Sequence, residues 1–171
     1  PPEPRIPTHL PTSLTDSVTS MLDPLDREIL RLVQENNRLS HAAIGKTVGL
    51  SDSSVRRRLH ALREKGVIEA DVSILAPETV GIQAIVTVSF ETESVEGDDA
   101  FRQRMLETPE VSQCYAVSGE VDYILVVHVP DLPSYEAWGK RVLMADPAIR
   151  RYGTHLVWNR VKFSTAIPLP G

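Results

Sequence analysis

Residues 39–66 read LSHAAIGKTVGLSDSSVRRRLHALREKG, and this stretch decides the fold of the first part of the chain. Ser40 and Ser51 each precede a helical pattern, where a side-chain oxygen can accept an otherwise unpaired backbone N–H. Gly49, between the two patterns, can adopt the positive φ that ends a helix. The second pattern also has an apolar stripe at spacings of four and three, formed by Val55, Leu59 and Leu62. The stretch therefore predicts two short helices with a tight turn, a helix-turn-helix.

The face of the second helix away from that stripe is basic. Residues 37–66 contain seven Lys or Arg and two Asp or Glu, a balance of +5, whereas the whole chain carries −5 and the remainder −10. This asymmetry is typical of an acidic protein with a DNA-binding segment, and an ordinary helical hairpin with a solvated basic face is the alternative. We predict base-edge contacts in a major groove from Ser53, Ser54 and Arg57, with Arg56 or His60 as further candidates. Phosphate contacts are expected from Lys46, Arg58 and Arg63.

Three further segments surround the helix-turn-helix. Residues 1–21 include five prolines in the first eleven positions, so we expect a flexible tail. A helical period over residues 24–35, with Pro24 suited to a first turn, predicts a helix that completes a three-helix unit over residues 22–66. Alternating, β-branched residues over 67–75 predict a strand or an extended linker, and we place the whole linker at residues 67–81.

The remaining residues, 82–171, show the order strand, helix, strand, strand, helix, strand. We predict strands at 83–92, 111–118, 122–129 and 149–157, helices at 98–108 and 132–145, and a further extended segment at 158–167. This is the ferredoxin-like βαββαβ arrangement, so the whole chain is α+β. Two helices cover one face of such a sheet, and this chain alone cannot hide Ile85, Cys114 and Val126. We therefore expect at least a dimer, with sheets packed face to face.

The composition and motifs exclude several classes of protein. The five histidines (9, 41, 60, 128 and 155) lack metal-ligand spacing, and there is no Gly-rich phosphate loop or nucleophile elbow, so we expect no enzyme, metal or cofactor. Cys114 is the single cysteine, which excludes an internal disulfide, and its mid-strand place predicts a buried apolar side chain rather than a thiol sensor. No apolar run approaches the roughly 20 residues of a membrane span, and no signal peptide is recognisable, so we expect a cytoplasmic protein.

Four motifs together resemble the Lrp/AsnC family, the feast/famine transcription regulators, over residues 22–167. They are LDPLDREIL (22–30), VGLSDSSVRRRLHALREKGVI (48–68), SGEVDYIL (118–125) and VPDLPSYEAW (129–138). The resemblance implies a winged-helix-like DNA-binding domain and a ferredoxin-like domain for effector binding and oligomerisation. It also implies a dimer built through the second domain, often assembled into a ring of four dimers, with amino acids or related metabolites bound at interfaces between second domains.

The resemblance also implies an effector site at the turn formed by residues 118–123. Gly119 would permit a close backbone approach, Asp122 would accept hydrogen bonds from an α-ammonium group, and free turn N–H groups would hold a carboxylate. In relatives a pair of threonines on the last strand supports the pocket, and a bulky tyrosine at the first matching position here would reshape it. The expected set is Ser118, Gly119, Glu120, Asp122, Tyr123, Tyr152 and Thr154. The alternative is that Gly119 and Asp122 simply form the hairpin turn.

We therefore expect a sequence-specific transcription regulator that responds to an amino acid or a related small metabolite. Its partners would be double-stranded DNA with a pseudo-palindromic operator, the effector, and further copies of the chain in a dimer or an octamer. Two alternatives remain open: an architectural DNA-binding protein with little ligand response, and a metabolite-binding module whose DNA contact is vestigial. The ratio of specific to nonspecific DNA affinity distinguishes the regulator from the architectural protein. Charge reversal at Arg57 distinguishes the regulator, which should lose operator binding, from the metabolite-binding module, which should not change in function.

Overall fold

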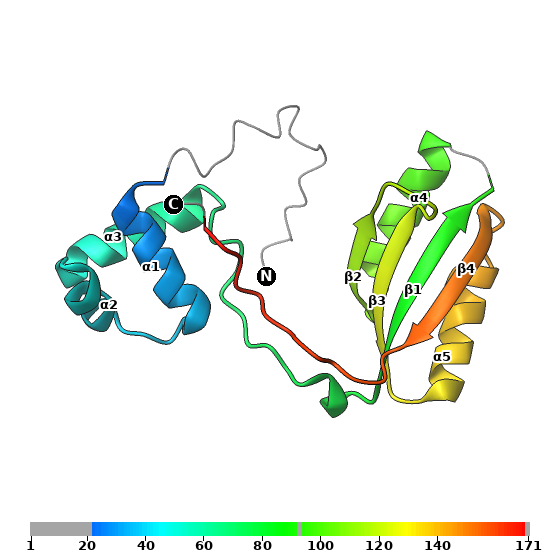
Figure 1. The fold of residues 1–171 in the computed structure, drawn as a ribbon. Coiled ribbons are helices and arrows are strands. Elements are labelled where there is room, and N and C mark those ends of the chain that lie inside the picture. Colours follow the sequence, from blue (N-terminus) through cyan, green and yellow to red (C-terminus); the bar gives the residue numbers. More distant parts are fainter. Residues whose placement is uncertain (1–21, 92–93, 170–171) are drawn as a thin grey trace. The chain divides into compact units, whose positions relative to one another are not determined.

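The computed structural model describes residues 22–91 and 94–169, which fall into two compact units (Figure 1). The first unit contains the described residues up to Ser73 together with those from Lys162 onward, and the second unit contains Ile74–Val161. The expected second domain covers residues 82–171, and in this grouping the residues from Lys162 onward lie with the first unit. The tail predicted at residues 1–21 lies outside the described residues.

The first unit is built on three helices, α1 (Pro24–Glu35), α2 (His41–Val48) and α3 (Asp52–Glu64), which confirms the predicted helix-turn-helix with its preceding helix. The predicted caps are present: Ser40 accepts a hydrogen bond from the N–H of Ala43, and Ser51 accepts one from the N–H of Ser54. Gly49 ends α2 with a φ of 74°. The helices enclose a core of Ile29, Ile44, Val55 and Leu59.

Of the two alternatives predicted for residues 67–75, a strand or an extended linker, the strand does not form. Residues 67–76 form no strand, and the one regular element in the linker over residues 67–81 is a single 3-10 turn, η2 (Pro77–Thr79). A strand needs a hydrogen-bonded neighbour, and no segment among residues 22–91 and 94–169 pairs with the linker. The extended segment predicted at 158–167 likewise forms no strand.

The second unit is a four-stranded antiparallel sheet with two helices, which confirms the predicted βαββαβ order. Its strands lie in the order β2-β3-β1-β4. They are β1 (Ile82–Phe90), β2 (Val111–Ala116), β3 (Tyr123–Val129) and β4 (Ile149–Leu156). The helices α4 (Val95–Glu107) and α5 (Leu132–Gly139) cover one face of the sheet (Figure 1).

Both helices of the second unit differ in detail from their predicted bounds. Helix α4 begins three residues before Asp98, because Ser94 caps it by accepting a hydrogen bond from the N–H of Gly97. Helix α5 continues into a π-helical turn, η3 (Lys140–Met144), so the predicted helix over 132–145 is not uniformly α-helical.

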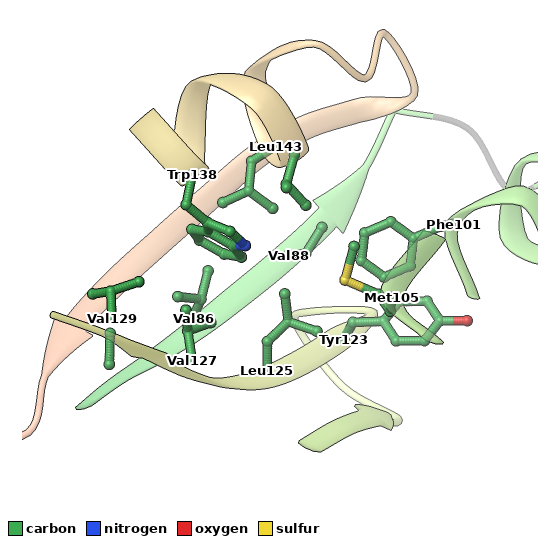
Figure 2. Packing of buried hydrophobic residues seen from close by; sticks show 12 residues of the cluster. Val86, Val88, Phe101, Met105, Tyr123, Leu125, Val127, Val129, Trp138 and Leu143 are labelled. Carbon is green, nitrogen blue, oxygen red and sulfur yellow. The ribbon is translucent and has the colours of Figure 1, made fainter. Parts of the chain in front are cut away.

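The core of the second unit lies between the sheet and its helices (Figure 2). Alternate residues of β1 and β3 face this side, so Val86 pairs with Leu125 and Val88 pairs with Tyr123 in the register of the sheet. The helices contribute Phe101, Met105, Trp138, Val142 and Leu143. The strict alternation of buried residues along β3 shows that one face is packed and the other is not.

The face of the sheet away from the helices carries apolar residues. Ile85 is 40% exposed and Tyr115 is 52% exposed, while Val126 is half-buried. Cys114 differs from its prediction in two ways. It lies opposite Leu125 and so points to the helix-covered side, and it is exposed because β2 is an edge strand.

Candidate functional site

Helix α3 begins in a cluster of serine hydroxyls. The Ser51 hydroxyl donates a hydrogen bond to Ser54 Oγ at 2.9 Å and lies 3.2 Å from Ser53 Oγ. Ser51 Oγ also accepts the N–H of Ser54 at 3.3 Å. Two of the predicted base-reading residues, Ser53 and Ser54, are therefore held in place by the cap of the helix.

Four of the predicted DNA-binding side chains lie on the surface of the first unit. Arg56, Arg57, His60 and Lys46 are exposed. Within residues 22–91 and 94–169, none of the four has a hydrogen bond or an ion pair to its side chain. Arg56 and Arg57 follow directly after the buried Val55. The buried stripe of α3, formed by Val55, Leu59 and Leu62, therefore leaves both arginines on the outer side of the helix. A face with two unpaired guanidinium groups can bind phosphates and guanine edges.

Arg58 differs from the expected phosphate contact, because its side chain is paired within the unit. Its Nη1 donates to Asp23 Oδ2 at 2.6 Å and to Asp26 Oδ1 at 2.7 Å. The backbone N–H of Asp26, followed by Arg58, holds the pKa of Asp23 below its usual 3.8. The two carboxylates in turn raise the pKa of Arg58. Arg58 therefore joins α3 to the start of α1.

Arg63 is also held by a carboxylate. Its Nε and Nη2 donate to the two carboxylate oxygens of Asp71 at 2.8 and 3.2 Å. This pair lowers the pKa of Asp71 and raises that of Arg63. The end of α3 is thereby tied to the linker that follows it, which differs from the expected phosphate contact.

The predicted effector turn is anchored to β1 by Asp122. The backbone N–H of Asp122 donates to the carbonyl of Val88 at 2.9 Å, and Asp122 Oδ2 accepts the N–H of Phe90 at 2.7 Å. The N–H of Val117 closes the hairpin on the Asp122 carbonyl at 3.0 Å. These bonds give Asp122 a structural part in the turn.

The rest of the turn is open to solvent. Ser118, Gly119 and Glu120 are exposed, and Gly119 has a φ of 132°. A Cβ added at Gly119 would meet no atom within 4 Å. The backbone here can therefore be approached closely from outside.

Tyr123 belongs to the core of the second unit, which differs from its expected packing on a ligand. Its ring centroid lies 4.7 Å from that of Phe101 and 5.8 Å from that of Phe90. Its hydroxyl donates to Asp98 and accepts from Arg102 Nε at 2.8 Å. Burial, followed by the bond to Asp98, raises the pKa of Tyr123 to about 12.

A groove of about 500 Å³ lies beside the turn. Two predicted site residues, Asp122 and Tyr123, border it, and its remaining lining is Phe90, Ser94, Val95, Asp98, Ala116 and Val117. Sequence reasoning missed Asp98, although its spacing of four from Arg102 was a signal for a helical pair.

Tyr152 and Thr154 lie on a different part of the second unit. In the register they stand opposite Val88 and Val86, so both point to the helix-covered side of β4. Thr154 Oγ1 lies 2.5 Å from the hydroxyl of Tyr135 on α5. Because β1 separates β4 from β3, a single chain does not bring these two residues to the effector turn.

The described ranges form neither a metal site nor a membrane span. No group of three His, Cys, Asp or Glu side chains there could hold a metal ion. None of the helices at residues 22–91 and 94–169 is long and apolar enough to span a membrane.

Comparison with known proteins identifies both units. Residues 22–63 match the model of the AsnC-type helix-turn-helix domain, and residues 83–167 match that of the Lrp/AsnC ligand binding domain. An uncharacterized HTH-type transcriptional regulator of Sinorhizobium fredii is 41% identical over 150 residues, covering 86% of this chain and 89% of the relative.

Two solved structures are similar to this chain in fold and in sequence. An AsnC family transcriptional regulator from Agrobacterium tumefaciens has a TM-score of 0.79 at 36% identity, covering 86% of this chain and 97% of that one. A transcriptional regulator from Neisseria meningitidis, solved as a complex with L-methionine, has a TM-score of 0.80 at 30% identity with the same coverage.

Proposed function

Because the chain belongs to the Lrp/AsnC family, whose members are transcriptional regulators and not enzymes, we propose that it regulates transcription by binding specific DNA in response to an amino acid or a related metabolite. The observation that carries the DNA-binding part is the division among the arginines of α3. Arg56 and Arg57 are exposed and unpaired within the described ranges, whereas Arg58 and Arg63 are held by carboxylates.

In this proposal α3 lies in a major groove and its free side chains read the DNA. Arg57 forms two hydrogen bonds with a guanine, worth about 1–3 kcal/mol of discrimination, and Arg56 and His60 flank it. Ser53 and Ser54 approach bases at the start of the helix, and Lys46 binds a phosphate. Arg58 and Arg63 support the helix from behind. A two-fold dimer would read a pseudo-palindromic operator.

Fluorescence anisotropy tests the DNA-binding part. A labelled duplex from the region upstream of this protein's gene is compared with a scrambled duplex at two salt concentrations. The proposal predicts a preference for the native duplex that persists at the higher salt. Equal, strongly salt-dependent affinity for both duplexes would instead support architectural binding, which rests on phosphates and DNA shape.

For the effector, we propose an amino acid bound at the open turn beside Asp122. Exposed turn N–H groups around Gly119 suit a carboxylate, and Ser118, Glu120 and Asp122 supply oxygens for an α-ammonium group. The L-methionine complex of the Neisseria meningitidis relative supports an amino acid as the class of ligand. Since Tyr152 and Thr154 do not reach the turn within one chain, we propose that an interface between copies completes the site.

Isothermal titration calorimetry with L-methionine and other single amino acids tests the effector site. Gly119→Ala should weaken the binding of the preferred amino acid at least about tenfold, because its Cβ occupies the space of closest approach. Gly66→Ala is the matched control, since Gly66 also has a positive φ (70°) and open space around it but lies in the first unit. Equal affinity in both variants would remove Gly119 from the site.

We also propose a homodimer built through the sheet face that carries Ile85 and Tyr115, with assembly to an octamer as a further step and a cytoplasmic site of action. The exposed apolar side chains on this face support a covering partner. Ile85→Lys should lower the molecular mass in analytical ultracentrifugation, because it places a charge in the interface. Leu106→Lys, at a 57% exposed site on α4, should leave the mass unchanged.

A further inference from the structure

We propose that the outer side of α1 is a docking surface for residues 164–169 of the same chain, and that this tail segment is a strap through which the second unit acts on the DNA-binding helices. The docking stands on contacts within the first unit. The regulatory part rests on the proposed DNA-binding function.

The strap is held on α1 through its backbone. The Ile167 N–H donates to Gln34 Oε1 at 2.8 Å, and Gln34 Nε2 donates back to the Ile167 carbonyl at 3.3 Å. Such a pair of bonds satisfies both backbone groups of one residue, as a neighbouring strand would. The N–H of Ala166 donates to Ser164 Oγ at 3.1 Å, which sets the approach to this point.

Beyond Ile167 the strap reaches a small apolar cluster. Leu169 packs against the buried Leu22, Leu30 and Leu62, which come from the start of the first unit, from α1 and from α3. Pro168 fixes the backbone between the two anchor points and has no N–H that would need a partner. The groove along α1, of about 570 Å³, is bordered by Pro24, Arg27, Glu28, Arg31, Gln34 and Glu35 on one side and by residues 166–169 on the other.

On one side the strap is covalently connected to the second unit. Residues 157–161 link it to β4, the strand that carries Thr154 and its bond to Tyr135. On the other side, α1 is joined to α3 by Asp23 and Asp26, which both pair with Arg58. A shift of β4 would therefore be transmitted through the docked strap to α1, and through the ion pairs to the recognition helix. The connection through residues 157–161 is covalent, and the contacts from the strap to α1 and from α1 to α3 are packed and hydrogen-bonded, of the kind that carry coupling between sites.

Removal of the strap from the full chain tests the docking. A variant that ends at Thr165 should lower the melting temperature of the first unit by about 4–8 °C. The peptide STAIPLPG, residues 164–171, added in excess should restore the melting temperature, and a scrambled peptide should not. Gln34→Ala should also lower the melting temperature of the first unit. Gln103→Ala, which removes a comparable bond to Glu107 on α4, should leave the first unit unchanged. An unchanged melting temperature in the truncated chain would overturn the docking site.

Operator affinity tests the regulatory part with the same variants. The truncated chain should bind the operator about fivefold or more weakly, at the low end of typical coupling between sites, and its affinity should no longer change with the amino acid. A truncated chain that melts early but keeps both the affinity and the response would overturn the strap as a regulatory device. If the full chain itself shows no preference for the operator over other DNA, the proposed function fails. The melting temperatures and the peptide experiment still show whether residues 164–169 dock on α1.

Discussion

Nη1 of Arg58 lies 2.7 Å from Oδ1 of Asp26, and this contact joins the recognition helix to the helix behind it. The arginine side chain is 26% exposed and that of Asp26 is 16% exposed, so the pair is partly shielded from solvent. Three consecutive arginines of α3 therefore have different roles. Arg58 supports the unit, while Arg56 and Arg57 remain free of partners among the described residues.

The first prediction concerns the stability of the DNA-binding helices. Arg58→Ala should reduce the free energy of unfolding of the first unit by about 1 kcal/mol, because it leaves Asp26 without its cation. Arg56→Ala, on the exposed face, should change it by less than about 0.5 kcal/mol. Urea denaturation followed by circular dichroism measures both. Equal effects would show that the Arg58 pair gives no net stabilisation.

The second prediction concerns the loss of stability of the first unit at low pH. The Asp26 N–H and Arg58 lower the pKa of Asp23, so the folded state binds this proton less tightly than the unfolded state. The stabilisation is therefore complete above the usual pKa of 3.8 and is lost as the pH falls through the lowered value. Denaturant titrations from pH 6 to pH 2 should show this loss in the first unit. In Asp23→Asn the slope below pH 4 should be smaller, and an unchanged slope would contradict the assignment.

The third prediction concerns the turn between α2 and α3. A Cβ added at Gly45 would lie 2.4 Å from the carbonyl oxygen of Leu50, which is backbone and cannot move aside. Gly45→Ala should therefore destabilise the first unit by about 2 kcal/mol or more, as overpacking does. Gly97→Ala is the control, since its nearest contact would be 3.7 Å and alanine favours the helix. Thermal unfolding of both variants measures the difference.

The fourth prediction concerns the thiol of Cys114. Desolvation raises its pKa to about 11, although the residue is exposed. At pH 8 it should react with a disulfide reagent roughly 100-fold more slowly than an ordinary exposed cysteine, because the thiolate is the nucleophile. Ala42→Cys in a Cys114→Ser chain provides that comparison. Similar rates for the two thiols would show that Cys114 is not shifted.

Local features of the fold were predictable because they depend on neighbours in the sequence. The caps at Ser40 and Ser51 and the turn at Gly49 follow from side-chain chemistry within one helical turn. The alternation along the strands gave the βαββαβ order for the same reason. The residues of the linker favour a strand or an extended segment, and the pattern alone does not decide between them, because a strand forms only where another segment supplies hydrogen bonds.

Contacts between distant parts of the chain were not predictable from the sequence. Arg58 and Asp26 are 32 residues apart, and Gln34 and Ile167 are 133 apart, so no local pattern brings either pair together. For the same reason Arg58 is expected from the sequence to contact a phosphate. Arg63 carries the same expectation, although its partner Asp71 lies only eight residues further along the chain. Tyr123 was expected at a ligand, but its place in the alternation of β3 turns it into the core. Tyr152 and Thr154 lie on β4, away from the turn, because of the order of the strands in the sheet, and no local pattern specifies that order.

Operator binding by Arg57→Ala and Arg58→Ala, measured by fluorescence anisotropy on the native and scrambled duplexes, tests the central proposal most directly. If α3 reads DNA through its free arginines, Arg57→Ala should lower the preference for the native duplex about tenfold or more. Arg58→Ala, measured well below its melting temperature, should retain that preference. The opposite result, with the preference kept in Arg57→Ala and lost in Arg58→Ala, would contradict the proposed division of roles on the recognition helix.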